Sequence, residues 1–162
     1  MRPIEIVGDN FTGTAAHMRV ACRAIIIREK KILLSCATRH DLYMLPGGGL
    51  EDGESEAACC AREVAEETGF LFRPALVALA VDEYYQDWRY HTLYYTGEIT
   101  GTTATKLTQD EIEGALAPRW LPLDAALALF AEHDRYRDVY ELKRGLYLRE
   151  YAALSAFLRK KN

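Results

Sequence analysis

The stretch PGGGLEDGESEAACCAREVAEETGF, residues 46–70, combines features that conflict with one another. Three consecutive glycines predict a tightly turning loop. Acidic residues follow at once, and the helix predicted after them ends in Glu63, Glu66 and Glu67. The C-terminal end of a helix carries partial negative charge, so each acid there costs about 0.3–1 kcal/mol. This concentration of acid suggests a bound cation that would reverse the sign of the interaction.

The spacing of the three glutamates places them on one side of the predicted helix. Ser55 is a suitable N-cap, and Gly69 is a suitable residue to follow the last turn. Residues at i, i+3 and i+4 lie about 5–6 Å apart at Cβ. An all-oxygen ligand set suits Mg²⁺ or Mn²⁺ rather than zinc. A solvated acidic face is the alternative interpretation, and the spacing alone leaves both open.

The glycines Gly47–Gly49 do not form a phosphate loop of the Walker type. That loop needs a lysine after its last glycine, and none follows here. The neighbouring carboxylates would repel a phosphate unless metal ions bridged the two. Glycine would then let the backbone turn tightly and bring a carbonyl to the same ions. The alternative is an ordinary turn between a strand and a helix.

The composition of the whole chain is that of a folded protein. Its 162 residues are 49% hydrophobic and 27% charged, with a net charge of −4, which predicts a single domain over residues 1–162. Mild acidity argues against a dedicated binder of nucleic acid or of membrane surfaces. The N-terminus lacks the apolar run of a signal peptide, and the four cysteines form no Cys-x-x-Cys pair. We expect a soluble cytoplasmic protein with free thiols.

The order of the expected elements is strands, helix, strands, helices. This order favours an α/β or α+β fold with a mixed β-sheet between helices. The expected segments are a hairpin of strands 20–27 and 31–37 joined by Arg28–Lys30, a short strand 41–46, strands 75–85 and 90–99 around the turn 86–89, a polar loop 100–118, a strand 119–123, a helix capped by Asp124 that runs to Phe130, and a terminal helix over about 138–160 that packs on the body.

The chain resembles the Nudix hydrolases. From Gly48 to Phe70 it carries all fixed positions of the 23-residue Nudix box, namely Gly48, Glu54, Arg62, Glu63, Val64, Glu66, Glu67, Gly69 and Phe70. The flanking YMLPGG and RWLPLD segments are similar to those of the family and extend a weaker resemblance over roughly residues 17–130. The resemblance is closest to the mutator-type pyrophosphohydrolases.

This resemblance implies the Nudix fold and Mg²⁺-dependent hydrolysis of a nucleoside diphosphate linked to another group. Glu63, Glu66 and Glu67 would be catalytic metal ligands, joined by the Gly48 carbonyl. Arg62 would hold a catalytic glutamate through a charge-assisted pair, and Glu54 would support the loop. Metal ions would neutralise charge on the diphosphate and lower the pKa of bound water. Dimers are common in the family, so the resemblance is compatible with a homodimer to which the C-terminal helix contributes.

Many Nudix enzymes use a further acid outside the box. The segment TQDEIEGALAPRW offers Asp110, Glu111 and Glu113. We favour Glu111 as a catalytic residue, because an acid followed by isoleucine before such a tryptophan is similar to the family pattern. The alternative is that all three are solvated loop charges.

The substrate is less clearly encoded than the chemistry. A base would stack on Tyr43, Tyr85 or Trp88, although aromatic residues in strands also serve as packing. Arg39 and Arg23 are candidates for contacts to a phosphate or a base edge, with exposed or salt-bridged arginines as the alternative.

Three functions compete. The first is a Nudix hydrolase acting on a nucleoside triphosphate or on a nucleoside diphosphate derivative such as ADP-ribose. The second is a catalytically inactive Nudix-fold module that binds or senses a nucleotide, against which the intact Glu63, Glu66 and Glu67 argue. The third is an interaction protein whose acidic helix is incidental, which the complete box disfavours. The residues do not distinguish the base or the leaving group.

Overall fold

A computed structural model describes residues 2–161 of the chain. Its strands form two sheets, whose orders are β1-β7-β8-β2-β6 and β3-β4-β5 with β9 on the other side of β4. The first sheet contains β1 (Ile4–Val7), β2 (His17–Ala24), β6 (Gly47–Gly49), β7 (Phe70–Tyr85) and β8 (Trp88–Thr102). The second contains β3 (Ile27–Arg28), β4 (Lys31–Ala37), β5 (Leu42–Met44) and β9 (Leu116–Pro122).

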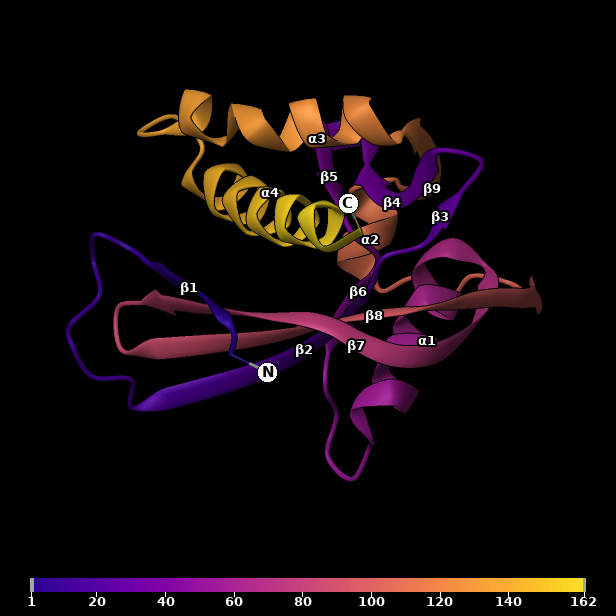
Figure 1. Ribbon diagram of the computed structural model, residues 1–162, viewed down its shortest axis with the longest axis horizontal. Coiled ribbons are helices and arrows are strands. Elements are labelled where there is room, and N and C mark those ends of the chain that lie inside the picture. The colour runs from indigo at the N-terminus through magenta and orange to yellow at the C-terminus, as the bar shows by residue number, and fades with distance from the viewer. Residues whose placement is uncertain (1, 162) are drawn as a thin grey trace.

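Helices cover both faces of the first sheet (Figure 1). The helices are α1 (Glu56–Thr68), α2 (Gln109–Glu113), α3 (Leu123–Ala131) and α4 (Glu141–Lys161), with short 3₁₀ turns η1 (Thr38–His40) and η2 (Glu132–Tyr136). Of these, α1 and α4 pack on the first sheet. The sheet is mixed, because β2 pairs with β8 in parallel while β7 and β8 are antiparallel. The expected fold class, α+β with helices around mixed sheet, is therefore confirmed, although the strands form two sheets rather than one.

Alternation along β8 separates two hydrophobic cores. Tyr94 points into the core under α3 and α4, where it is fully buried with Phe130 and Leu154. The next residue, Tyr95, points to the opposite core with Val64 of α1. Successive side chains of a strand face opposite sides, so one long strand serves both layers.

The predicted hairpin of residues 20–27 with 31–37 is correct only at its turn. Strand β2 ends at Ala24, and only Ile27–Arg28 pair with β4 around the turn residues Glu29 and Lys30. The Ala24 amide donates to the Pro46 carbonyl instead, so the chain crosses from one sheet to the other at this point. The apolar run over residues 20–27 therefore gave no indication that the chain changes from one sheet to the other within it.

Other boundaries also differ from the expectation. The glycines Gly47–Gly49 form strand β6 against β2 rather than a loop. The segment expected to be a polar loop contains α2 and the start of β9. Asp124 lies in the first turn of α3 and accepts a hydrogen bond from the Ala125 amide, whereas the residue at the N-cap is Pro122. Helix α4 begins at Glu141 rather than near residue 138.

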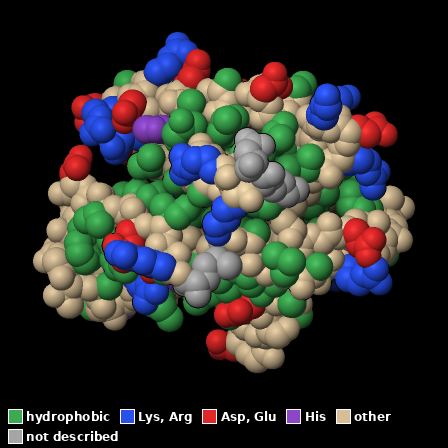
Figure 2. Space-filling model, in the orientation of Figure 1, with side chains coloured by type: hydrophobic (Ala, Val, Ile, Leu, Met, Phe, Trp, Pro, Cys, Tyr) green, Lys and Arg blue, Asp and Glu red, His purple; other side chains and the backbone are tan. Residues whose placement is uncertain are grey.

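Charges of both signs lie intermixed on the face seen in Figure 2, rather than gathered by sign. This distribution agrees with the small net charge of −4. Within residues 2–161, no helix combines the length and the apolar character that crossing a membrane requires.

Candidate active site

Helix α1 begins and ends where its sequence predicts. The Ser55 hydroxyl accepts a hydrogen bond from the Ala58 amide at 3.2 Å, and Gly69 ends the helix with φ of 72°. Cys59, Cys60 and Val64 bury one side of the helix against the sheet. This packing fixes the rotation of the helix, and Glu63, Glu66 and Glu67 are positioned with it.

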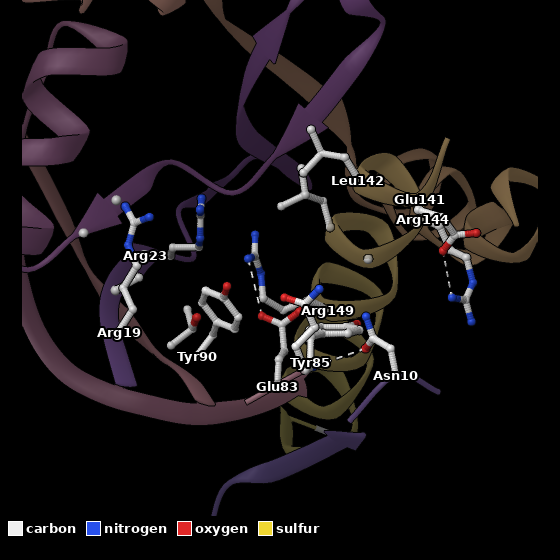
Figure 3. A pocket seen from close by; sticks show the side chains of 17 residues that line it. Asn10, Arg19, Arg23, Glu83, Tyr85, Tyr90, Glu141, Leu142, Arg144 and Arg149 are labelled. Atoms are coloured by element: carbon white, nitrogen blue, oxygen red, sulfur yellow. Dashed lines mark hydrogen bonds and ion pairs between the residues drawn. The ribbon is translucent and has the colours of Figure 1, made fainter. Parts of the chain in front are cut away.

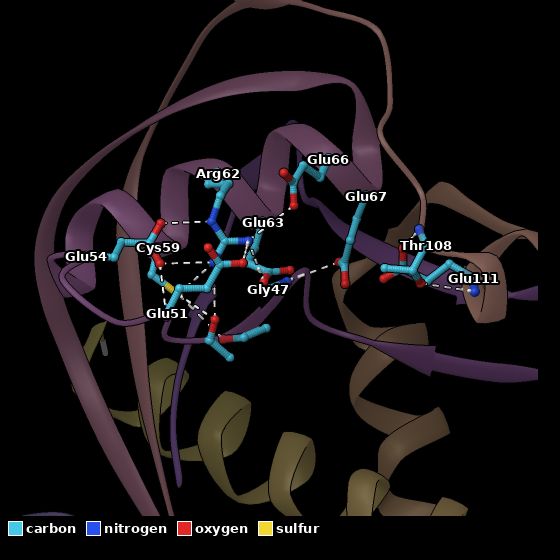
Figure 4. Close-up of polar contacts among 12 residues, drawn as sticks. Gly47, Glu51, Glu54, Cys59, Arg62, Glu63, Glu66, Glu67, Thr108 and Glu111 are labelled. Carbon is cyan, nitrogen blue, oxygen red and sulfur yellow. Dashed lines mark hydrogen bonds and ion pairs between the residues drawn. The ribbon is translucent and has the colours of Figure 1, made fainter.

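Arg62 is the centre of the acidic cluster (Figure 4). Its Nη1 atom donates to Glu63 Oε1 at 2.9 Å and to Glu66 Oε2 at 3.2 Å. Its Nε and Nη2 atoms donate to the two oxygens of Glu54 at 2.8 and 3.0 Å. These bonds lower the pKa of Glu54 and raise the pKa of Arg62. One guanidinium thus holds three carboxylates of the box in place.

Glu67 is the most buried of the three α1 glutamates Glu63, Glu66 and Glu67, with 6% of its surface exposed. Its Oε2 atom accepts hydrogen bonds from the Ser35 hydroxyl at 2.6 Å and from the Gly47 amide at 3.1 Å. Burial raises the pKa of Glu67 to about 7, against 4.5 for an ordinary glutamate. Its hydrogen-bond donors are both neutral, and the charge of Arg23 offsets only part of the effect of burial on the pKa of Glu67.

The Gly48 backbone lies directly against the Glu63 carboxylate. A Cβ atom at Gly48 would stand 2.4 Å from Glu63 Oε2, so no other residue fits here without a shift. The glycine therefore lies in contact with the acidic helix, and the role of its carbonyl as a metal ligand stays a prediction.

The ligand set consists of oxygen atoms only, which suits a hard divalent cation. Within residues 2–161, no three acidic, histidine or cysteine side chains converge on one point. The reason is local, because Arg62 bridges Glu63 and Glu66 while Glu67 is turned toward Ser35. The buried Glu67 carboxylate, whose hydrogen-bond donors are both neutral, and the close approach of the Gly48 backbone to Glu63 fit a cation.

Glu111 lies beyond Glu67 in Figure 4, where its carboxylate accepts a hydrogen bond from the Thr108 amide at 2.7 Å. The loop before α2 is tied to α1 by a hydrogen bond from the Lys106 amide to the Glu66 carbonyl at 2.9 Å. Burial raises the pKa of Glu63, and the charges of Glu66 and Glu111 add smaller contributions in the same direction. Glu113 instead accepts a hydrogen bond from Gln109. Asp110 is exposed.

A cavity of about 580 Å³ opens beside the acidic cluster. Its floor is one face of the first sheet, its roof is the beginning of α4, and its end is formed by Gly48 and Gly49. The floor is built from alternate residues of three strands: Arg19 and Arg23 on β2, Glu83 and Tyr85 on β7, and Tyr90 and Thr92 on β8.

Two of the five predicted substrate contacts, Arg23 and Tyr85, line this cavity. Trp88 is not a lining residue, but it stacks on Tyr90 with ring centroids 5.8 Å apart. Arg39 and Tyr43 are not at the cavity.

Arg39 and Tyr43 lie by the second sheet instead. Arg39 in η1 donates to the Glu113 carbonyl, and Tyr43 on β5 packs against the core. Closeness in sequence to Gly47–Gly49 therefore does not place Arg39 and Tyr43 at the cavity.

A model of the NUDIX domain family matches residues 17–142. The chain belongs to the Nudix family. This Nudix hydrolase is similar to the human diphosphoinositol polyphosphate phosphohydrolase 3-beta, with 29% identity over 114 residues, or 70% of this chain and 68% of the relative. It is also 26% identical over 106 residues to YjhB of Bacillus subtilis (strain 168), whose name gives a provisional assignment as an ADP-ribose pyrophosphatase. That match covers 61% of this chain and only 51% of YjhB, about half its length.

A solved NUDIX hydrolase from Nitrosomonas europaea shares the fold of this Nudix hydrolase. The two have a TM-score of 0.58 and 25% sequence identity, with 83% of this chain and 88% of the other covered. Nudix hydrolases generally use divalent metal ions, and the acidic cluster lies in the segment that the family model matches.

The raised pKa of Glu67 predicts a pH dependence of stability. In metal-free protein, the folded state retains a proton on Glu67 between pH 4.5 and about pH 7, whereas the unfolded state has lost it. The unfolding free energy should therefore fall by about 3 kcal/mol as the pH rises through this window and level off above it. Urea unfolding at a series of pH values would measure the slope. Glu67→Gln should flatten it, and equal slopes in both proteins would contradict the assignment.

Proposed function

We propose that this Nudix hydrolase cleaves a diphosphate linkage in a nucleotide, with Mg²⁺ held by Glu63, Glu66, Glu67 and the Gly48 carbonyl. Mn²⁺ would serve in the same site. The observation that carries the proposal is that Gly48, which forms one end of the cavity with Gly49, lies directly against the Glu63 carboxylate of α1. The chemistry of the bound cation would be to neutralise phosphate charge and to lower the pKa of an attacking water.

The protein groups supply position and proton transfer. Arg62 keeps the carboxylates of the cluster at fixed places on a rigid helix. Glu111 is proposed to accept a proton from the attacking water, because it lies beyond Glu67 in Figure 4 and its charge acts on Glu63. The Arg19 guanidinium is proposed to bind the diphosphate. Its guanidinium lies beside Gly49, with Nη2 3.0 Å from the place of a Cβ there.

The charge balance of the cavity favours a nucleotide over a highly phosphorylated inositol. Arg149 forms ion pairs with Glu83 and Glu150, and Arg144 forms an ion pair with Glu141. Among the lining arginines, these two are thus already compensated. An inositol carrying many phosphates would need many free cations, whereas one diphosphate needs the metal site and Arg19.

A substrate panel tests this function. The protein would be incubated with Mg²⁺ and nucleoside triphosphates, ADP-ribose, other nucleoside diphosphate derivatives and a diphosphoinositol polyphosphate, and released phosphate or pyrophosphate would be measured. Hydrolysis of at least one nucleotide, lost in Glu67→Gln, is the expected result. Nucleotide binding without hydrolysis in the unmodified protein would favour the inactive binding module instead. Equal hydrolysis by both proteins would contradict the metal assignment.

The role of Glu111 has its own prediction. Glu111→Gln should lower kcat by about a hundredfold or more, since it removes the proton acceptor. Glutamine still suits the capping box that Glu111 makes with Thr108, so α2 should persist. Glu113→Gln is the matched control and should keep near-full turnover. The opposite pattern, with Glu113→Gln inactive and Glu111→Gln active, would show that the wrong acid was chosen.

A further inference from the structure

The roof of the cavity lies beyond the part of the chain that the family model matches. The match ends at residue 142, whereas Gly145 and Arg149 of α4 line the cavity. Arg149 stands over Glu83 of β7 (Figure 3). The side of the cavity away from Gly48 and Gly49 is thus formed partly by α4 residues outside the match.

Glu83 in the floor of the cavity and Arg149 in its roof form a buried polar pair. Glu83 is 5% exposed and Arg149 is 8% exposed, and both line the cavity. Glu83 Oε2 lies 3.5 Å from Arg149 Nη1, which is longer than a good hydrogen bond. Arg149 Nη2 donates to Glu150 Oε1 at 2.7 Å, which fixes the guanidinium plane. The pair therefore presents a fixed acceptor beside a fixed donor, with hydrogen-bonding capacity left for a ligand.

We propose that Glu83 and Arg149 recognise a planar heterocycle that presents an N–H group next to a carbonyl. Glu83 accepts from the N–H, and Arg149 donates to the carbonyl oxygen. Guanine and uracil have such an edge, whereas adenine and cytosine place an amino group beside an unprotonated ring nitrogen. The inference rests on the proposed function, since it assigns the base of the nucleotide substrate.

The surroundings of the pair suit a flat ring. Tyr90 is the residue opposite Glu83 in the β7–β8 register. Trp88 stacks on Tyr90 at an interplanar angle of 19° and supports the ring from one side, which leaves its other face for a base. Above them, Gly145 leaves room, because a Cβ there would meet only the Tyr85 hydroxyl, at 3.7 Å.

The site for the base and the site for the diphosphate lie at different places in one cavity. Arg19 stands toward Gly49, and the Glu83–Arg149 pair lies beyond Tyr90 (Figure 3). A nucleotide placed with its diphosphate at the acidic cluster thus extends its base toward α4.

Binding of the four nucleoside 5′-monophosphates GMP, UMP, AMP and CMP tests the proposal. Calorimetry without divalent metal would compare the unmodified protein with Glu83→Met, which removes the acceptor and keeps the chain length. We expect GMP and UMP to bind about tenfold or more tighter than AMP and CMP. Glu83→Met should reduce this preference to about twofold while AMP affinity stays within about threefold.

Two further variants complete the design. Glu98→Met, at an exposed site paired with Arg73 on the far part of the sheet, should keep the preference. Gly145→Leu should weaken all four ligands about tenfold or more, because its side chain enters the cavity. Equal binding of the four ligands by the unmodified protein, binding of none, or an unchanged preference in Glu83→Met would each overturn the proposal.

The outcome is separable from that of the proposed function. Nucleotide hydrolysis without any preference for the base would overturn this inference and leave the proposed function intact. Selective binding of GMP and UMP by a protein that hydrolyses no nucleotide would support this inference and overturn the proposed function.

Discussion

Glu67→Gln should lower kcat for nucleotide hydrolysis by about a hundredfold to ten-thousandfold. The carboxylate is buried and held by Ser35 and Gly47, so the amide occupies the same place but carries no charge for a cation. KM should change much less, because the base and most of the cavity lie elsewhere. Steady-state kinetics with saturating Mg²⁺ would measure both constants.

The matched control for this variant is Glu98→Gln, an exposed glutamate on β8 far from the cluster. It should keep full turnover. Circular dichroism would verify that both variants are folded. A folded Glu67→Gln protein with kcat within about threefold of the unmodified enzyme would contradict the assignment of Glu67 as a metal ligand.

Arg62→Met should produce the second large effect, on stability as well as on activity. The change leaves Glu54, Glu63 and Glu66 beside one another without their shared cation. Removing one partner of a buried ion pair costs about 3–5 kcal/mol. Arg62 is about a quarter exposed, so we expect a loss of about 2–3 kcal/mol in metal-free urea unfolding. Mg²⁺ should recover part of this loss, since it would replace the guanidinium beside Glu63 and Glu66.

Arg73→Met is the control, because Arg73 makes only an exposed pair with Glu98. Its cost should be below about 1 kcal/mol, with or without Mg²⁺. If Arg62→Met and Arg73→Met were equally mild, Arg62 would be an ordinary surface arginine.

Local sequence predicted the acidic helix well. Its cap at Ser55, its end at Gly69 and the spacing of its glutamates depend on residues within a few turns of one another. The pairing of Arg62 with its glutamates is equally local and is present in the structure. The class of fold followed from the order of the elements.

Contacts between distant segments could not be predicted in this way. Ser35 of β4 donates to Glu67, which is 32 positions away in the chain, and nothing in the sequence around Ser35 indicates this contact. Arg149 meets Glu83 only after α4 has packed on the sheet.

The floor of the cavity did leave a signal in the sequence. Near the turn between β7 and β8, alternate positions carry polar or aromatic residues, and Glu83, Tyr85 and Tyr90 share one face. A period of two shows which residues share a face of one strand, but not which strands lie beside it. The strand pairing was therefore needed to place these residues around one cavity.

The dependence of hydrolysis on Mg²⁺ concentration tests the central claim most directly. Initial rates on a nucleotide substrate would be measured across an Mg²⁺ titration, with EDTA as the zero point, for the unmodified enzyme and for Glu66→Gln. If the acids of α1 hold the metal, EDTA should abolish turnover and Glu66→Gln should need about tenfold more Mg²⁺ for half its maximal rate. Full turnover in EDTA, or the same Mg²⁺ dependence in both proteins, would contradict it.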